Sequence, residues 1–382
     1  MDLSVADQRI PTLSELLRLS REALSNLGLA CISLVCSTGL PGAEDVEIPV
    51  YLARVAEWAD IVRQEIPKFV YAFESNPTAF ANSESVFLMR VLVQVLKLKM
   101  GIHCNEKRTE PSESNAWYTD SRDLLIHGPL GPTRRGTCNN IPMAVAAVAR
   151  ELGYPVYLAT TPYHVYGKWV GSDGYTFNIE ATNPAGMVSH SDDYYRDRPV
   201  PMPDSILRSG YYMRPLDIVD ELALCMVSRG WVLEAHHQYP QAALAHAHAC
   251  RLAPTEPNYP RVAARCVSRW MRCAYNANVS EQFRISCKGE YQYSDLYLDP
   301  QRLLPAEHVP LALTIMGRFY ETHDKRDLAA AIYDAAGSLY RDKRNRLNSN
   351  KARKLRLTDE SVTESNDKRP CENDIRKESL SC

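Results

Sequence analysis

Apolar residues recur at helical spacing through the first hundred positions of the chain. Residues 12–26 begin with a capping-box pattern (TLSE) and continue as an amphipathic run. Pro49 opens a second apolar stripe, since proline is tolerated in the first turn of a helix. Residues 83–100 form a third stripe, apolar on more than one face, which predicts a buried helix. We therefore expect a helical region over residues 1–100.

The pattern between residues 134 and 187 predicts a glycine turn, one helix and a pair of strands. Pro142 is acceptable only in a first helical turn, so the helix should begin close to Cys138, capped by Thr137 or one of the asparagines that follow. Gly153 supplies the C-terminal stop. The apolar positions at helical spacing are Ile141, Val145, Val148 and Leu152.

A β-hairpin should follow this helix. Residues 155–161 form a short apolar run, and two aromatic-rich runs then flank the turn-forming residues 171–174. If Val170 pairs with Tyr175, His164 lies opposite Ala181, one register step from Glu180. Asn178 and Glu180 then share a face, because side chains alternate along a strand.

These elements place a thiol, an imidazole and a carboxylate in one region. A thiol at a helix N-terminus sees free N–H groups and the positive end of the helix dipole, and both favour the nucleophilic thiolate of Cys138. His164 would take its proton, and Glu180 would orient His164. Considered singly, each has a plainer interpretation: a packed cysteine, a structural histidine and a buried salt bridge. Asn178 is the reserve candidate for the orienting role.

The stretch resembles the transglutaminase-like branch of the papain-like cysteine enzymes. The resemblance rests on Gly-Thr-Cys opening a helix, a histidine entering a strand and the acid of Glu180-Ala181-Thr182, and it covers residues 120–186 well. It implies a Cys138, His164 and Glu180 triad. It also implies an α+β core over residues 101–214, in which the nucleophile helix packs on an antiparallel sheet and the N-terminal helices lie behind it.

Helical patterns resume at Pro215 and contain a possible repeat. Residues 215–340 resemble tetratricopeptide helix pairs, which could bind a protein partner. Residues 341–382 are highly charged and lack periodicity, so we expect a disordered tail. A solvated run of charges is favoured over a segment that binds nucleic acid or an acidic partner. The small residues at matching intervals are Gly230, Ala242 and Ala249 in one segment, and Gly317, Ala329 and Ala336 in the other.

Composition, net charge and missing motifs argue against several classes of function. The 382 residues are 45% apolar and 24% charged with a net charge of −2, typical of a globular protein without a pull toward nucleic acid or membrane. The eleven cysteines include no CxxC pair, and the N-terminus lacks the pattern of a secretory signal, so a cytoplasmic location is expected. The histidines at 236, 237, 246 and 248 lack metal-ligand spacing, and phosphate-binding glycine loops are missing, so we expect neither metal nor cofactor.

The sequence favours a cysteine-dependent acyl-transfer enzyme acting on amide bonds of a protein or peptide substrate. Attack by Cys138 would give a thioester, which water or an amine would resolve in a protease, deamidase or transglutaminase reaction. The alternative is a non-catalytic scaffold that keeps the core as a platform and binds peptides through its helical repeats. The three filled triad positions favour the enzyme.

Overall fold

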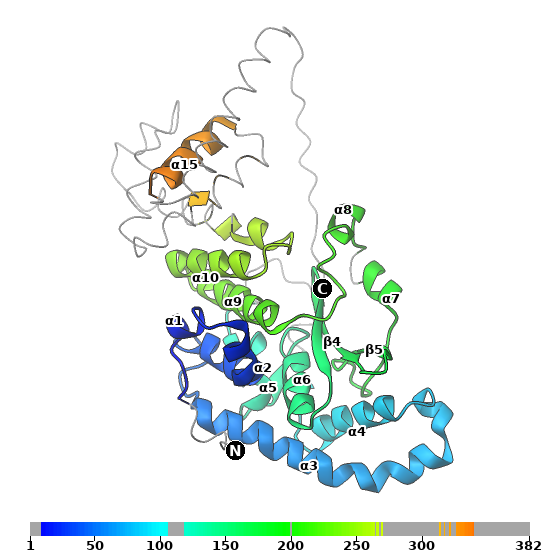
Figure 1. Cartoon of the computed structure of the whole chain (residues 1–382). Helices are drawn as coiled ribbons and strands as arrows, with labels where there is room; N and C mark the ends of the chain where they lie inside the picture. Colours follow the sequence, from blue (N-terminus) through cyan, green and yellow to red (C-terminus); the bar gives the residue numbers. More distant parts are fainter. Residues whose placement is uncertain are drawn as a thin grey trace. The chain divides into compact units, whose positions relative to one another are not determined.

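The computed structural model describes residues 9–105, 118–198, 201–263 and 326–339, together with a few positions between 265 and 321 (Figure 1). The fold is mixed α+β, mostly helical, with a small three-stranded antiparallel sheet. The chain divides into two compact units, and the first contains the sheet and all helices up to Ala235. In the described part of the chain, no helix is long and apolar enough to cross a membrane.

The first N-terminal helices differ in length from their sequence pattern. The capping box is confirmed at Thr12, but α1 (Leu13–Leu16) ends after one turn. Helix α2 (Arg21–Ser37) then starts from its own cap at Ser20 and continues through the apolar run that follows. Gly28 interrupts α2 with a φ of 74°, a backbone conformation that glycine adopts without steric cost. The expected helix over residues 12–26 is therefore two elements.

Two longer helices complete the N-terminal region. Helix α3 (Ile48–Ser75) has Pro49 in its first turn, as predicted, and carries Pro67 in its interior. The short 3₁₀ helix η2 (Pro77–Phe80) leads to α4 (Glu84–Leu98), which Ser83 caps by accepting a hydrogen bond from the Val86 amide. Most of α4 is buried, as its sequence predicted.

The described part of residues 101–136 contains only short elements. The parallel strands β1 (His103–Cys104) and β2 (Arg135–Gly136) pair, with Cys104 opposite Gly136. Between them in sequence lie η5 (Ser121–Asp123) and α5 (His127–Leu130). This pairing brings Cys104 next to the segment that leads into Cys138.

Helix α6 (Ile141–Glu151) is the centre of the first unit. Every residue from Ile141 to Ala149 is buried, not only one face, because α6 packs against β3 and β4 on one side and against α2, α3 and α4 on others (Figure 1). It ends in a Schellman motif, in which the Tyr154 amide bonds to the Ala149 carbonyl and Gly153 has a φ of 81°. The predicted stop at Gly153 is confirmed.

The sheet has the order β3–β4–β5. Its strands are β3 (Val156–Thr161), β4 (His164–Val170) and β5 (Thr176–Ile179), and both pairings are antiparallel. The hairpin forms as predicted, but its register differs by one residue because Val170 pairs with Thr176. An isolated bridge between Glu180 and Val188 extends pairing beyond β5.

The helices after the sheet complete the first unit. Short α7 (Asp192–Asp197) and α8 (Asp204–Leu207) lead to α9 (Ile218–Ala235), which packs against α2. Sequence had grouped α9 with the helices that follow, whereas its contacts place it with the first unit. Most of α9 is buried there.

The second unit contains α10 (Tyr239–Leu252) and α15 (Arg326–Leu339). A side chain at Gly317 would place its Cβ 2.7 Å from the Tyr333 ring, so this glycine allows a close approach. Ala329 and Ala330 are buried beside Tyr333. The charged tail, residues 341–382, lies outside the described residues.

Candidate active site

The residues around Cys138 form a tight turn that leads into α6. The Thr137 carbonyl accepts hydrogen bonds from the Asn140 and Ile141 amides, while the Thr137 amide donates to Asn140 Oδ1 at 2.8 Å. The Asn139 amide donates to Thr137 Oγ1. Asn140 occupies the N-cap position without a side-chain bond into the helix. The helix thus begins three residues after Cys138, and the turn, not a standard cap, fixes the thiol at its N-terminal end.

Two asparagine side chains attach this turn to the rest of the first unit. Asn139 Nδ2 donates to the Leu124 carbonyl at 2.7 Å and to Ser228 Oγ on α9 at 2.9 Å. Asn140 Nδ2 donates to the carbonyls of Arg122 and Leu125. Both asparagines are buried, so these bonds satisfy amide groups that would otherwise be costly to bury. The position of Cys138 is therefore set by long-range contacts as well as by the helix.

The structure brings Cys138, His164 and Glu180 together. The His164 Nε2 lies 2.6 Å from Glu180 Oε2, and the Cys138 thiol is close enough to the same ring to raise the pKa of His164. Because Glu180 takes Nε2, Nδ1 is the ring nitrogen left for Cys138. Glu180 is buried, while Cys138 and His164 are partly exposed.

The corrected register explains how the acid reaches the histidine. In the observed pairing Lys168 lies opposite Asn178, so the alternation of side chains places His164 and Glu180 on the same face of the hairpin. The predicted pairing of Val170 with Tyr175 would have put them on opposite faces. The observed loop is one residue longer than predicted, and this single residue places the histidine and the acid on the same face of the hairpin.

The surroundings of His164 and Glu180 favour the charged form of each side chain. Burial disfavours the imidazolium, but the nearby Cys138 thiol and the hydrogen-bonded Glu180 carboxylate raise the pKa of His164 to about 10. Burial also disfavours the Glu180 carboxylate, yet its hydrogen bonds with His164 and Thr182 lower its pKa to about 2. At neutral pH the pair is thus a charged imidazolium on an ionised carboxylate.

Two residues that the sequence did not single out also hold Glu180. Thr182 donates to Glu180 Oε1 from its amide at 3.0 Å and from its hydroxyl. Tyr195, on α7, donates to Oε2 at 3.2 Å. Thr182 follows the acid in the quoted motif and could have been suspected from it. Tyr195 lies fifteen residues downstream of the acid and gave no sequence signal.

Asn178, the reserve candidate, has a different role. It shares the face of Glu180, as predicted, but its Nδ2 donates to Asp192 Oδ1 at 2.7 Å and to the His190 carbonyl. Lys168 also binds Asp192, with Nζ 3.0 Å from Oδ1. Asn178 therefore attaches the start of α7 to the sheet instead of orienting His164.

Cys104 also lies close to this site. Its Sγ donates to the Thr182 carbonyl at 3.1 Å. Burial raises the pKa of Cys104, nearby Lys97 lowers it, and nearby Cys138 raises it further.

A backbone donor is available beside the thiol. In the described part of the chain the amides of Thr137, Asn139, Asn140 and Ile141 all have acceptors, whereas the Cys138 amide has none. A free amide at the nucleophile is the group that stabilises a developing oxyanion in acyl transfer.

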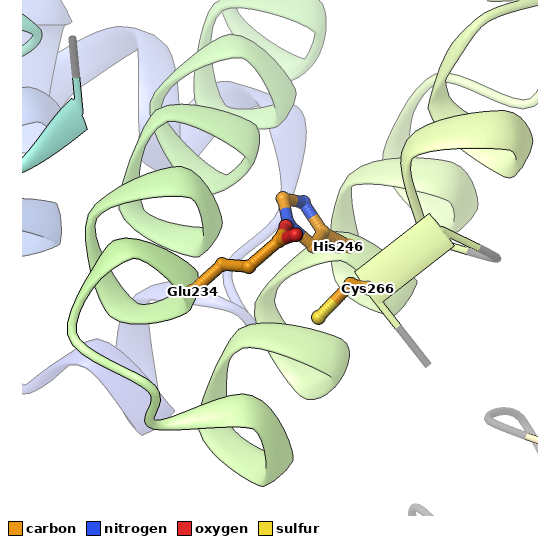
Figure 2. A group of neighbouring side chains, drawn as sticks. All are labelled: Glu234, His246 and Cys266. Carbon is orange, nitrogen blue, oxygen red and sulfur yellow. The ribbon is translucent and has the colours of Figure 1, made fainter. Parts of the chain in front are cut away.

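Candidate metal ligands are few in the described part of the second unit. Figure 2 draws His246 on α10 and Cys266, which belong to this unit, together with Glu234, which belongs to the first. The candidate ligand atoms of His246 and Cys266 lie within 4.8 Å of each other, and two described ligands are fewer than the three or four protein groups that a zinc site uses. Cys266 also lies against the Tyr239 carbonyl.

Comparison with known proteins assigns no family. No protein-family model matches the chain, and no curated protein matches it. Among solved structures the chain is similar to menin, in a crystal structure that reveals its binding site for the Mixed Lineage Leukemia (MLL) protein. The identity is 16%, covering 76% of this chain and 72% of that one, with a TM-score of 0.24. At that TM-score the similarity carries no argument about fold or function.

Proposed function

We propose that this protein is a cysteine-dependent acyl-transfer enzyme that acts on amide bonds through Cys138, His164 and Glu180. The observation that supports it is the hydrogen bond between the His164 imidazole and the Glu180 carboxylate, with the Cys138 thiol near the same imidazole and at the amino end of a buried helix. The charge states suit these roles, because the carboxylate stabilises a protonated imidazole and the protonated imidazole stabilises a thiolate.

The first half of the reaction forms a thioester. The Cys138 thiolate attacks the amide carbonyl carbon, the carbonyl electron pair moves to oxygen, and the Cys138 amide donates to that oxyanion. As the intermediate collapses, the carbon–nitrogen bond breaks and His164 gives its proton to the leaving amine. Glu180 keeps the ring oriented so that Nδ1 faces the sulfur.

The second half releases the acyl group. His164, now neutral, takes a proton from water or from an incoming amine, which attacks the thioester carbonyl. The carbon–sulfur bond breaks, and the thiolate and imidazolium are restored. Water gives a protease or deamidase, and an amine gives a cross-linking enzyme. A transglutaminase-like, papain-like core is part of this proposal, with a protein or peptide as substrate.

The test is the pH dependence of Cys138 alkylation by iodoacetamide, followed by peptide mass spectrometry. We expect Cys138 to react rapidly at pH 6, well below the pKa of about 8.5 of a free thiol, and to lose this reactivity in His164→Gln. Cys104 in the same digest is an internal control, because burial raises its pKa and it should react slowly. His190→Gln is the matched control variant and should behave as wild type.

An ordinary thiol profile for Cys138, unchanged by His164→Gln, would contradict the proposal. That result would favour the scaffold alternative, and the next experiment would be a search for a peptide that binds the C-terminal helices. If the ion pair is present, peptide amides and glutamine-containing peptides are the first substrates to screen, with and without an added primary amine.

A further inference from the structure

We propose that Tyr195 is a positioning residue for this reaction, which holds the Glu180 carboxylate in the orientation that His164 requires. This inference rests on the proposed function and adds a group from outside the triad. Tyr195 donates its hydroxyl to Glu180 Oε2 at 3.2 Å, and the same oxygen lies 2.6 Å from His164 Nε2. The hydroxyl and the imidazole therefore share one acceptor atom.

The two carboxylate oxygens of Glu180 are held separately. Oε1 accepts from the amide and hydroxyl of Thr182, and Oε2 accepts from His164 and Tyr195. A glutamate has a flexible side chain, and loss of its rotamer freedom opposes any fixed geometry. Thr182 fixes one oxygen but leaves rotation about the carboxyl group possible. The Tyr195 hydroxyl opposes that rotation at the oxygen on which His164 depends.

The Tyr195 ring is itself held rigidly. It stacks on the Tyr166 ring with a centroid distance of 3.8 Å and an interplanar angle of 2°. The His164 ring lies nearly parallel to it, with centroids 5.9 Å apart. Tyr195 is 1% exposed and Tyr166 is fully buried. The hydroxyl is thus presented by a packed group of three rings and not by a mobile side chain.

The sheet also fixes the backbone that carries Tyr195. Asp192 at the start of α7 accepts hydrogen bonds from Asn178 on β5 and Lys168 on β4. Ser191 caps α7 by accepting from the Tyr194 amide. These bonds anchor α7 to the strands that carry the triad, so the distance between Tyr195 and Glu180 is set by one connected structure.

Tyr195 remains a donor over the working pH range. Burial raises the pKa of its hydroxyl, and the nearby Glu180 carboxylate raises it further. An anionic tyrosine beside the carboxylate is therefore disfavoured, and the hydroxyl proton stays on the oxygen that faces Oε2.

The test is Tyr195→Phe in the full-length chain, with Tyr166→Phe as its matched control. Each variant removes one buried hydroxyl and keeps the stacked ring. The Tyr166 hydroxyl has no hydrogen-bond partner in the described structure, so its loss should not affect Glu180. The readout is the pH profile of Cys138 alkylation, with thermal unfolding midpoints measured to establish that both variants fold.

We expect Tyr195→Phe to lower the Cys138 alkylation rate at pH 6 about fivefold or more, the effect of losing one hydrogen bond to a charged group. The alkylation profile should shift to higher pH, while Tyr166→Phe follows wild type. A Tyr195→Phe rate equal to or above wild type overturns the inference. Equal losses in both variants also overturn it, because they would show that only the ring packing matters.

Failure of the proposed function gives a different pattern. If wild-type Cys138 has no reactivity below pH 7, the ion pair is absent, and the roles of both the triad and Tyr195 are overturned together. If wild type is reactive and His164→Gln is not, the triad stands, and the comparison of the two tyrosine variants alone decides the role of Tyr195.

Discussion

Arg150 and Glu221 form a bidentate ion pair that joins the end of α6 to the start of α9. Arg150 Nη1 lies 2.8 Å from Oε2 and Nη2 lies 2.5 Å from Oε1, while Arg150 Nε donates to the Val156 carbonyl on β3. Glu221 is 1% exposed. One guanidinium therefore connects the nucleophile helix with both the sheet and the helix that carries Ser228.

Replacing Arg150 with methionine should strongly destabilise the first unit. The change leaves the Glu221 carboxylate buried without its counter-ion, which costs about 3 to 5 kcal/mol of unfolding free energy. Denaturant unfolding measures this. Arg63→Met is the control, because its pair with Asp60 is exposed on both sides and should contribute less than about 1 kcal/mol. Adding Glu221→Leu to Arg150→Met should recover much of the loss, and equal effects of the two arginine variants would contradict the assignment.

Gly136→Ala should disrupt the turn that holds Cys138. A Cβ at this position would lie 2.6 Å from Asn140 Oδ1 and 2.8 Å from Ile141 Cγ1, so Asn140 must move away from the Thr137 amide. We expect Cys138 alkylation at pH 6 to fall on the order of tenfold to a hundredfold, the usual effect of an ångström-scale displacement of a reactive group.

Gly153→Ala is the control for general destabilisation of α6. Its positive φ makes alanine strained there, and nothing lies within 4 Å of the added Cβ. It should lower the unfolding free energy by about 1 kcal/mol and leave the alkylation profile unchanged. A normal profile in Gly136→Ala would show that the turn tolerates the methyl group and that the glycine is not required.

The sequence predicted those features that depend on neighbouring residues. The capping box at Thr12 and the helix stop at Gly153 follow from local hydrogen bonds and backbone preferences, and both are confirmed. The hairpin was also local, but its register was wrong because turn residues indicate where a loop lies and not which residue first pairs after it.

Other features depend on contacts between distant segments and could not be predicted in this way. Helix α6 is buried all round since sheet and helices enclose it, whereas its periodicity indicated one apolar face. Cys104 reaches the site because β1 pairs with β2, and Tyr195 reaches it because α7 is anchored to the sheet. Neither a two-residue strand nor a six-residue helix has a periodic pattern long enough to recognise.

Gly317→Ala should destabilise the second unit. The added Cβ would lie 2.7 Å from the buried Tyr333 ring, and overpacking of this kind costs about 1 to 3 kcal/mol. Hydrogen exchange read by mass spectrometry should show faster exchange in α15 peptides. The exposed Asp327→Ala on the same helix is the control and should have little effect. Unchanged protection of α15 in Gly317→Ala would mean that the glycine is not needed for this close approach.

The stability that His164 contributes should depend on pH in a defined direction. Its pKa is raised from 6.5 to about 10, so folding favours the protonated ring. The contribution is fully present below about pH 6.5 and is lost as the pH rises through about 10. The difference in unfolding free energy between wild type and His164→Gln should therefore be largest near pH 6 and should shrink toward pH 10. Denaturant titrations at each pH measure it, with the exposed His103→Gln as control. A difference that is constant over this range, or that grows with pH, would mean that the imidazolium is not stabilised by Cys138 and Glu180 in the folded protein.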